Sequence, residues 1–207
     1  MELIQPSVQI IDDVDELQVL TKLELCGRTA YKSEDRITKG SAEKFIRGII
    51  KSGHGSVLEH VNITVKFICD RGVTHELVRH RIASYTQEST RYCNYTKKGI
   101  VFIVPPWDFD DCDLMFLRAV EEQYNRKIAE GQTPQQARAY LPNCLKTEIV
   151  TTMNVREWRH VLGLRTKPDC HPQMRQIMNI LLAEFKQRLP LLFEDIDECN
   201  QINDRKL

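Results

Sequence analysis

The chain has no long hydrophobic run, and its first residues lack the features of a secretion signal. Its longest apolar stretches are short, such as Ile100–Pro106, whereas a membrane-spanning helix needs about 20 apolar residues. Met1–Pro6 has neither the basic start nor the apolar segment of a signal peptide. We therefore expect a cytoplasmic protein that has no membrane partner.

Cysteine pairs with the spacing of metal ligands are also missing. The seven cysteines are an odd number, are scattered and never form a C-x-x-C pair, which argues against a disulfide framework and against zinc. They are Cys26, Cys69, Cys93, Cys112, Cys144, Cys170 and Cys199. Neither His54 with His60 nor His75 with His80 has the i, i+4 spacing that would put two ligands on one helical face. We expect no metal.

The chain has no excess of either charge and no glycine-rich nucleotide loop. Its 29 basic and 29 acidic residues give a net charge of zero, which disfavours nucleic acid as a partner. No G-x-G-x-x-G occurs, so a Rossmann domain is not expected. The segment 79–98 is nevertheless basic, since Glu88 is its only acid. A local cluster of arginines in a neutral protein indicates a small anionic ligand.

Hydrophobic periodicity predicts an α+β fold, with an antiparallel central sheet flanked by helices and a helical C-terminal half. A length of 207 residues fits a single domain that spans 1–207. Strands are expected at Val8–Ile11, Val61–Ile68 and Ile100–Val104. Helices are expected at Val14–Tyr31, Ser41–Ser52, Asp70–Arg81, Asp111–Ala129, Thr133–Leu141, Met153–Leu164 and Gln173–Leu189.

The segment with the most chemistry begins at Arg79-His80-Arg81 and continues to Tyr92. Arginine offers a planar fork of donors that matches phosphate or carboxylate oxygens. Gln87 and Ser89 add neutral hydrogen-bonding groups that can read the edge of a ring. Together these residues are suited to a phosphorylated heterocycle. The alternative is a solvated surface segment, which the density of donors beside one acid disfavours.

This segment resembles the signature of the flavin-dependent thymidylate synthases. Arg79-His80-Arg81, seven further residues and Ser89 match the R-H-R-x7-S pattern of that family. Further segments are similar to family elements in the same order, namely Gly53–His60, Ala137–Pro142, Asn154–Arg156 and Leu162–Arg165. The resemblance extends from Lys51 to Gln176, which is most of the chain.

The resemblance implies a single catalytic domain that methylates dUMP to dTMP with 5,10-methylenetetrahydrofolate as the carbon donor. It implies FAD as the cofactor, reduced by NADPH, with FADH2 as the hydride donor. No cysteine and no metal take part in such a reaction. It also implies a cytoplasmic homotetramer whose active sites lie at subunit interfaces.

The resemblance, carried over residue by residue, implies a site with members in both halves of the chain. The residues implied to contact FAD are Ser56, Arg79, His80, Arg81, Gln87, Asn154, Arg156 and His160. The residues implied to surround dUMP are Glu76, Arg79, Gln87, Ser89, Thr90, Arg91, Arg138 and Arg165. Arg91 and Arg138 are implied to lie near the phosphate, and His54 near the flavin ring. Arg165 is implied to be catalytic, because an arginine beside N3 of the pyrimidine stabilises developing negative charge.

The sequence departs from the family at some of these positions. The family often has glutamine in place of Glu76 and asparagine in place of His160 and Gly163, and some members have glutamate in place of Gln87. A carboxylate close to a phosphorylated substrate needs an arginine partner, so we expect Glu76 to have one. His171 is not assigned to the site.

Other interpretations stay open at the level of sequence. The same arginines would serve a non-catalytic module that binds nucleotides or phosphate. Cys170-His171 suggests the Cys-His pair of the unrelated cysteine-dependent thymidylate synthases, although the surrounding sequence does not match. Three arginines would be ordinary surface residues if they paired with nearby acids. These are Arg138, Arg156 and Arg165, with Glu148, Glu157 or Asp169 as partners.

Overall fold

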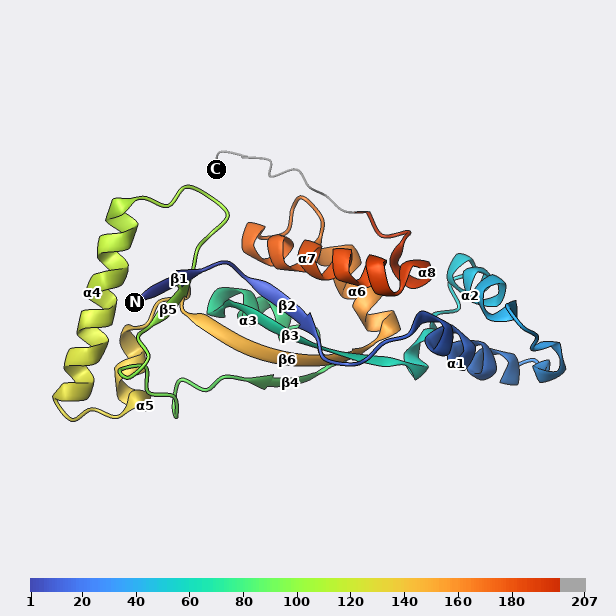
Figure 1. The fold of residues 1–207 in the computed structure, drawn as a ribbon, viewed down its shortest axis with the longest axis horizontal. Coiled ribbons are helices and arrows are strands. Elements are labelled where there is room, and N and C mark those ends of the chain that lie inside the picture. The colour runs from blue at the N-terminus through green and yellow to red at the C-terminus, as the bar shows by residue number, and fades with distance from the viewer. Residues whose placement is uncertain (198–207) are drawn as a thin grey trace.

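A four-stranded antiparallel sheet runs through the middle of the molecule (Figure 1). The computed structural model describes residues 1–197, and Cys199 lies outside the described residues. The strand order is β2 (Ser7–Ile10), β3 (Asn62–Asp70), β6 (Lys146–Asn154) and β4 (Ser84–Gln87). Strands β3 and β6 pair along their whole length. The predicted α+β class with an antiparallel central sheet is confirmed.

The sheet has one buried face. Side chains of a strand alternate between the two faces, so every second residue of β3 and β6 is buried. In β3 the buried residues include Ile63, Val65 and Phe67, as the predicted strand Val61–Ile68 requires. In β6 the buried residues are Thr147, Ile149, Thr151 and Met153. Side chains between these positions, such as Lys66 and Glu148, point to the other face, which stays partly exposed.

Strand β6 shows that the predicted helix Met153–Leu164 was wrong at its start. Met153 and Asn154 are the last residues of the strand, and helix α6 (Val155–Arg165) begins directly after them. Half of the buried positions of β6 are threonines, whose β-branched side chains fit a strand but do not register as an apolar pattern. Strands β4 and β1 (Glu2–Ile4) were also not predicted.

Helices α6, α7 (Pro172–Arg188) and α8 (Pro190–Phe193) lie over the buried face of the sheet and complete the larger hydrophobic core (Figure 1). Trp158 of α6 is fully buried in this core, where its ring contacts those of Phe67 and Phe185. Its Nε1–H donates a hydrogen bond to the backbone oxygen of Ile63 at 2.9 Å. Within residues 1–197, every helix is too short or too polar to cross a membrane.

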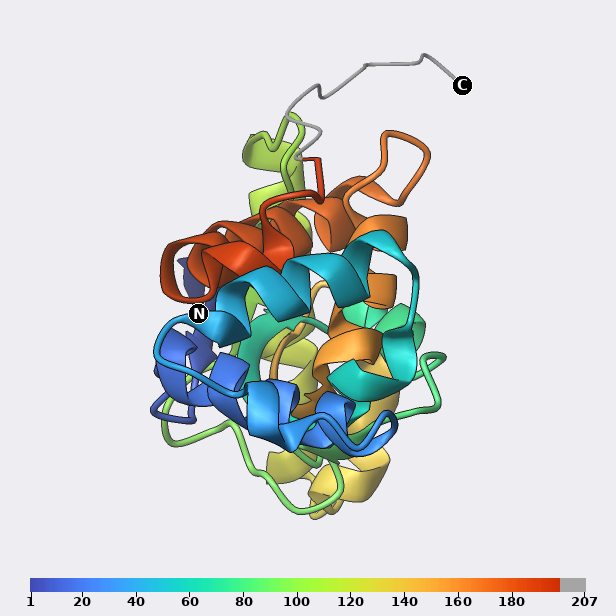
Figure 2. The ribbon, with the colours of Figure 1, turned by 90° about the vertical axis from the view of Figure 1, so that its right-hand side faces the viewer.

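The two ends of the molecule carry different elements (Figures 1 and 2). One end holds α1 (Glu16–Thr29), the 3-10 helix η1 (Glu34–Arg36), α2 (Ser41–Lys51) and the 3-10 helix η2 (Gly55–His60). The other end holds a parallel pair formed by β1 and β5, together with three helices. These elements are β5 (Val101–Ile103), α4 (Asp111–Ala129), α5 (Pro134–Ala137) and the 3-10 helix η3 (Arg138–Tyr140). They enclose a second, smaller hydrophobic core.

Helix α3 (Arg71–Leu77) begins where the sequence predicts, because the side chain of Asp70 accepts a hydrogen bond from a backbone N–H of the first turn at 2.8 Å. It ends at Leu77 and does not continue through the R-H-R segment as predicted. The hydroxyl of Tyr85 lies 2.8 Å from the carbonyl oxygen of Leu77 and 2.7 Å from that of His80, and donates to both. Tyr85 thereby holds the segment between α3 and β4 in a turn.

Trp158→Ala is expected to lower the free energy of unfolding by about 3–5 kcal/mol, because it leaves a cavity in a packed core. Trp107→Ala is the matched control, since Trp107 is 50% exposed and its loss is expected to cost less than about 1 kcal/mol. Urea unfolding followed by circular dichroism measures both. Equal losses in the two variants would contradict this assignment of the core.

Candidate functional site

The R-H-R segment lies in the turn between α3 and β4, with a buried residue between two exposed ones. His80 is 8% exposed, whereas the flanking Arg79 and Arg81 are open to solvent. Within residues 1–197, neither of these arginines has an ion-pair partner. Two neighbouring guanidinium groups that lack a carboxylate are suited to an anionic ligand.

Arg165, the last residue of α6, reaches the same turn from the helical layer. Its Nε–H donates to Nε2 of His80 at 3.0 Å, and its Nη1 donates to a carboxylate oxygen of Glu76 at 2.9 Å. The arginine partner expected for Glu76 is therefore present. Because two of its nitrogens are engaged in different directions, the guanidinium plane of Arg165 has a fixed orientation.

His80 is neutral at physiological pH. Burial, with smaller effects from the nearby positive charge of Arg165 and from His160, lowers its pKa to about 4. Since Nε2 accepts a hydrogen bond from Arg165, the proton of the neutral ring sits on Nδ1. That atom lies 3.9 Å from a carboxylate oxygen of Glu157. His80 thus lies between a cation on one side and an anion on the other.

The side chains of His80, Glu157 and His160 bring ligand atoms within 4.8 Å of one another, which is the grouping of a small metal site. Sequence spacing did not reveal this group, because His80 is distant in sequence from α6. A metal on Nδ1 of His80 would have to displace its proton while Nε2 accepts from Arg165. A guanidinium in contact with the same ring also repels a metal cation. The contacts of His80 therefore disfavour a metal here.

A hollow of about 400 Å³ lies beside this cluster and is lined by several of the predicted FAD contacts. Its lining residues are Glu59, Ile82, Asn154, Arg156, Glu157 and His160. Arg156 forms an ion pair with Glu59 at 2.6 Å across it. Gly55 permits this position of Arg156, because a Cβ at Gly55 would lie 2.9 Å from Nε of the arginine. The lining combines the donors of Arg156, Asn154 and His160 with two carboxylates, a mixture of donors and acceptors that suits the sugar or ring edges of a dinucleotide.

Four further predicted residues meet at the start of the loop after β4. Nη1 of Arg138 donates to the hydroxyl of the buried Thr90 at 3.3 Å. The backbone N–H of Arg91 donates to the hydroxyl of Ser89 at 3.3 Å, and its Nε–H donates to Oε1 of Gln135 at 2.9 Å. Gln135 was not predicted, since no charge or motif marks it. Within the described part of the chain, Arg91 and Arg138 have no carboxylate partner.

The remaining predicted residues lie at other positions. Gln87 donates from Nε2 to the hydroxyls of Thr74 and Thr147 at 3.0 and 3.3 Å, so its amide is directed toward α3 and β6. His54 and Ser56 are exposed at the beginning of η2, which packs against α6. In residues 1–197, no hydrogen bond or ion pair joins the Arg91 and Arg138 cluster to the one around Arg165.

The surroundings of Cys170 and His171 disfavour the Cys-His alternative. Burial raises the pKa of the Cys170 thiol despite the opposing effect of Arg165, which disfavours a nucleophilic thiolate. The ring of His171 packs edge-on against Trp107, with 6.1 Å between ring centroids. The cysteine and histidine therefore have separate surroundings, unlike a nucleophile and its base.

The surface ion pairs suggested for three arginines were wrong in their partners. Arg156 pairs with Glu59 and Arg165 with Glu76. Arg138 has a threonine hydroxyl in place of an acid. Only the pairing of Arg156 joins two exposed side chains and matches the expectation of a surface pair.

Known proteins are similar to this chain in sequence and in fold. A family model described as Thymidylate synthase complementing protein matches residues 14–191. The flavin-dependent thymidylate synthase of Pyrococcus furiosus is 35% identical over 170 residues, which cover 78% of this chain and 70% of that protein. The enzyme of the same name from Mycobacterium tuberculosis (strain CDC 1551) is 33% identical over 215 residues, covering 93% of this chain and 84% of the other.

Two solved structures have a similar fold. The UMP/dUMP methylase PolB from Streptomyces cacaoi, bound with 5-Br dUMP, has a TM-score of 0.77 at 25% identity and covers 94% of this chain and 96% of its own. Thymidylate Synthase X from Helicobacter pylori, with FAD and dUMP, has a TM-score of 0.77 at 22% identity and covers 92% and 98%, which shows a common fold. From the family match and the relatives above 30% identity, the chain belongs to the flavin-dependent thymidylate synthases.

Proposed function

We propose that the protein methylates dUMP to dTMP, with 5,10-methylenetetrahydrofolate as the carbon donor, FAD as the cofactor and NADPH as the reductant. The observation that carries this proposal is the position of Arg165. At this position the guanidinium is fixed by Glu76 and by the neutral His80, and the hollow that Asn154, Arg156 and His160 line lies beside it. All of these belong to a member of the flavin-dependent thymidylate synthases.

The FAD contacts come from the hollow beside His160 and from the R-H-R turn. Arg79 and Arg81 provide the positive charge that a diphosphate requires in the absence of a glycine-rich loop, and Arg156, which pairs with Glu59, adds N–H donors. The side-chain oxygen of Asn154 caps α6, which leaves its amide N–H groups for a ligand. Gln87, Ser56 and His54 complete this set by resemblance to the family. When bound and reduced, FAD supplies the hydride.

The dUMP phosphate binds at the loop after β4. Among the described residues, Arg91 and Arg138 have no carboxylate partner and so are available to an anion, while Ser89 and Thr90 add hydroxyl groups beside them. Phosphate on two arginines is a strong, charge-assisted arrangement. Glu76, Arg79 and Gln87 contribute to the pyrimidine side of the same substrate.

Arg165 acts on the pyrimidine ring itself. A cation held against N3 stabilises the deprotonated ring and so increases the electron density at C5, where the methyl group is added. The neutral ring of His80 accepts from Nε, Glu76 accepts from Nη1, and the Cys170 sulfur lies within hydrogen-bonding reach. A guanidinium has five N–H groups, so others serve the substrate. The pair with Glu76 restrains the guanidinium without removing its charge.

The assembly proposed for this chain is a homotetramer of single catalytic domains with active sites at subunit interfaces. Support comes from the separation of the contacts within one copy, where no hydrogen bond or ion pair in residues 1–197 links the Arg91 cluster with Arg165. In an oligomer, the loop after β4 of a second copy would place its Arg91 and its phosphate site next to the flavin contacts around His160. Size-exclusion chromatography with light scattering tests the assembly.

Release of tritium from dUMP labelled at C5 is the direct test of the reaction. We expect release that depends on methylenetetrahydrofolate and NADPH, from a yellow protein that retains FAD. A colourless protein that binds dUMP but retains no added FAD would instead favour a non-catalytic binding module.

Arg165→Ala is expected to lower turnover by about 100-fold or more, because it removes the cation that faces the pyrimidine. FAD remains bound, which the flavin absorbance measures. Arg118→Ala is the control, since Arg118 is an exposed arginine of α4 outside the predicted site. Wild-type turnover in the Arg165 variant would contradict its catalytic role.

Arg91→Ala is expected to raise the KM for dUMP by about tenfold or more, because one charge-assisted contact to phosphate is lost. The change in kcat is expected to be smaller. Lys97→Ala, which removes an exposed cation of the same loop, is the matched control. An unchanged dependence on dUMP in the Arg91 variant would remove Arg91 from the phosphate site.

A further inference from the structure

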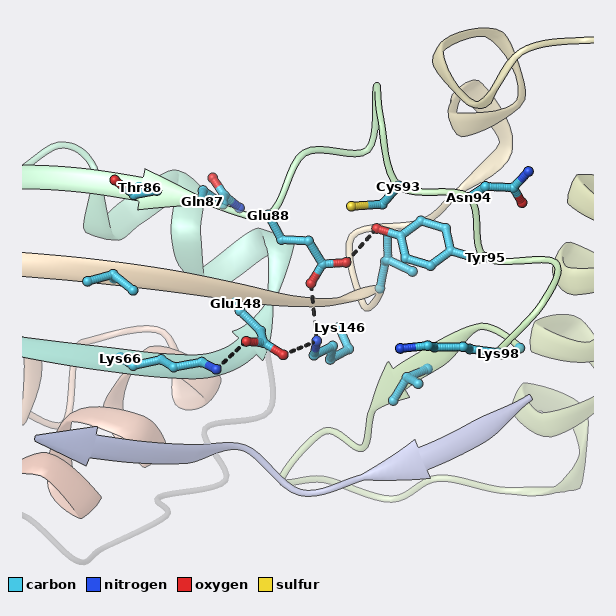
Figure 3. A pocket seen from close by; sticks show the side chains of 14 residues that line it. Lys66, Thr86, Gln87, Glu88, Cys93, Asn94, Tyr95, Lys98, Lys146 and Glu148 are labelled. Atoms are coloured by element: carbon cyan, nitrogen blue, oxygen red, sulfur yellow. Dashed lines mark hydrogen bonds and ion pairs between the residues drawn. The ribbon is translucent and has the colours of Figure 1, made fainter. Parts of the chain in front are cut away.

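The partly exposed face of the sheet has a cavity of about 730 Å³ next to the loop that follows β4 (Figure 3). Charged side chains and a tyrosine, from β3 and β6 and from both ends of this loop, line this cavity. They include Lys66, Glu88, Tyr95, Lys98, Lys146 and Glu148. The sequence analysis placed none of these residues in the active site, yet five of them are linked by hydrogen bonds and ion pairs where the loop after β4 begins.

Glu88 is the centre of these contacts. The hydroxyl of Tyr95 donates to Oε1 of Glu88 at 2.8 Å, and Nζ of Lys146 donates to Oε2 at 3.1 Å (Figure 3). Lys146 also pairs with Glu148 at 2.6 Å, and Glu148 pairs with Lys66. Both carboxylate oxygens of Glu88 are thus occupied, in a side chain that is only 17% exposed.

The backbone of Glu88 is restrained as well. Its N–H donates to the carbonyl oxygen of Glu148 at 2.9 Å, one residue beyond the end of β4. Its carbonyl oxygen accepts from Nη1 of Arg71 at 3.5 Å. Glu88 is therefore fixed relative to β6 through its main chain and its side chain, and the chain leaves the sheet from a rigid point.

Tyr95 restrains the other end of the loop. Its ring packs against the buried Tyr124 of α4 with 5.9 Å between centroids, and its backbone N–H lies 3.5 Å from the Tyr124 hydroxyl. Burial raises the pKa of Tyr95, and its hydrogen bond to Glu88 raises the pKa further. The phenol therefore stays protonated and remains a donor at neutral pH. Tyr95 connects the sheet with the smaller core.

We propose that the hydrogen bond between Tyr95 and Glu88 closes the loop 89–94 at its base and so positions Ser89, Thr90 and Arg91 for the phosphate of dUMP. The inference rests on the proposed function for the identity of the ligand. Tyr95 and Glu88 are positioning residues, because they touch the loop and are not assigned to the substrate. A loop held at both ends has less conformational freedom to lose when the ligand binds.

The contacts inside the loop are few, which makes its closure important. Ser89 forms the turn that begins it, since its carbonyl oxygen accepts from the N–H groups of Tyr92 and Cys93 at 3.2 and 3.0 Å. Tyr92 at the tip is 78% exposed. Within this turn, the side chains of Arg91 and Thr90 have hydrogen bonds to Gln135 and Arg138, both more than 40 residues away in sequence, and the Arg91 guanidinium lies over the Tyr92 ring.

Tyr95→Phe tests the proposal, because it removes one hydroxyl and keeps the ring in its packing against Tyr124. We expect the KM for dUMP to rise about tenfold, the value of one hydrogen bond to a charged group, while kcat changes less than about twofold. Hydrogen exchange of the amides in 89–94 is expected to become faster. Tyr31→Phe is the matched control, since Tyr31 is 71% exposed.

Glu88→Ala supplies a second, independent variant with the same expected direction. In the double variant the rise in KM is expected to be smaller than the product of the two single effects, because each single substitution already removes the same hydrogen bond between Tyr95 and Glu88. Thermal unfolding of each variant separates a local change from a loss of folding.

The outcomes distinguish the inference from the function it builds on. A wild-type chain that releases no tritium would contradict the proposed function, and the exchange rates of 89–94 would still decide whether Tyr95 closes the loop. An active wild type with an unchanged KM in Tyr95→Phe would overturn the inference, even with faster exchange. Unchanged exchange would overturn it as well.

Discussion

The orientation of the Arg165 guanidinium is the constraint on which the arrangement of the site depends. An arginine that acts on the pyrimidine must hold its guanidinium in a defined direction, and the groups that hold it must leave N–H groups for the ring. Here Nε donates to an uncharged imidazole and Nη1 to a single carboxylate oxygen of Glu76. The low pKa of His80 keeps that imidazole an acceptor. A protonated His80 would repel Arg165 and lose the hydrogen bond.

The fold brings these groups together through two similar strand-to-helix junctions. Asp70 caps α3 directly after β3, and Asn154 caps α6 directly after β6, each through a side-chain oxygen that accepts from the helix. Because β3 and β6 are antiparallel, the two caps lie at opposite ends of the pair. Both helices then fold back over the sheet, and the turn after α3 meets the last residue of α6. A cation at a helix C-terminus is also favoured by the helix dipole.

Two surfaces of the molecule differ in whether their cationic side chains are paired with carboxylates. On the open face of the sheet, Lys66 and Lys146 are paired with glutamates, which leaves the charges there balanced. In residues 1–197, Arg79, Arg81, Arg91 and Arg138 have no carboxylate partner. A chain of zero net charge thus keeps a local positive potential for phosphorylated ligands, and the excess of acidic residues that compensates it lies elsewhere in the chain.

The sequence by itself determined the family, the amphipathic helices and the cap at Asp70, because these depend on residues close together along the chain. It also indicated that Glu76 needs an arginine. Only the tertiary structure decided that the arginine is Arg165, that His80 is neutral, and that Tyr95 closes the loop on Glu88. It also decided the central position of β6, whose buried threonines carry no apolar signal. These properties arise from burial and from contacts between segments far apart in sequence, which local patterns do not encode.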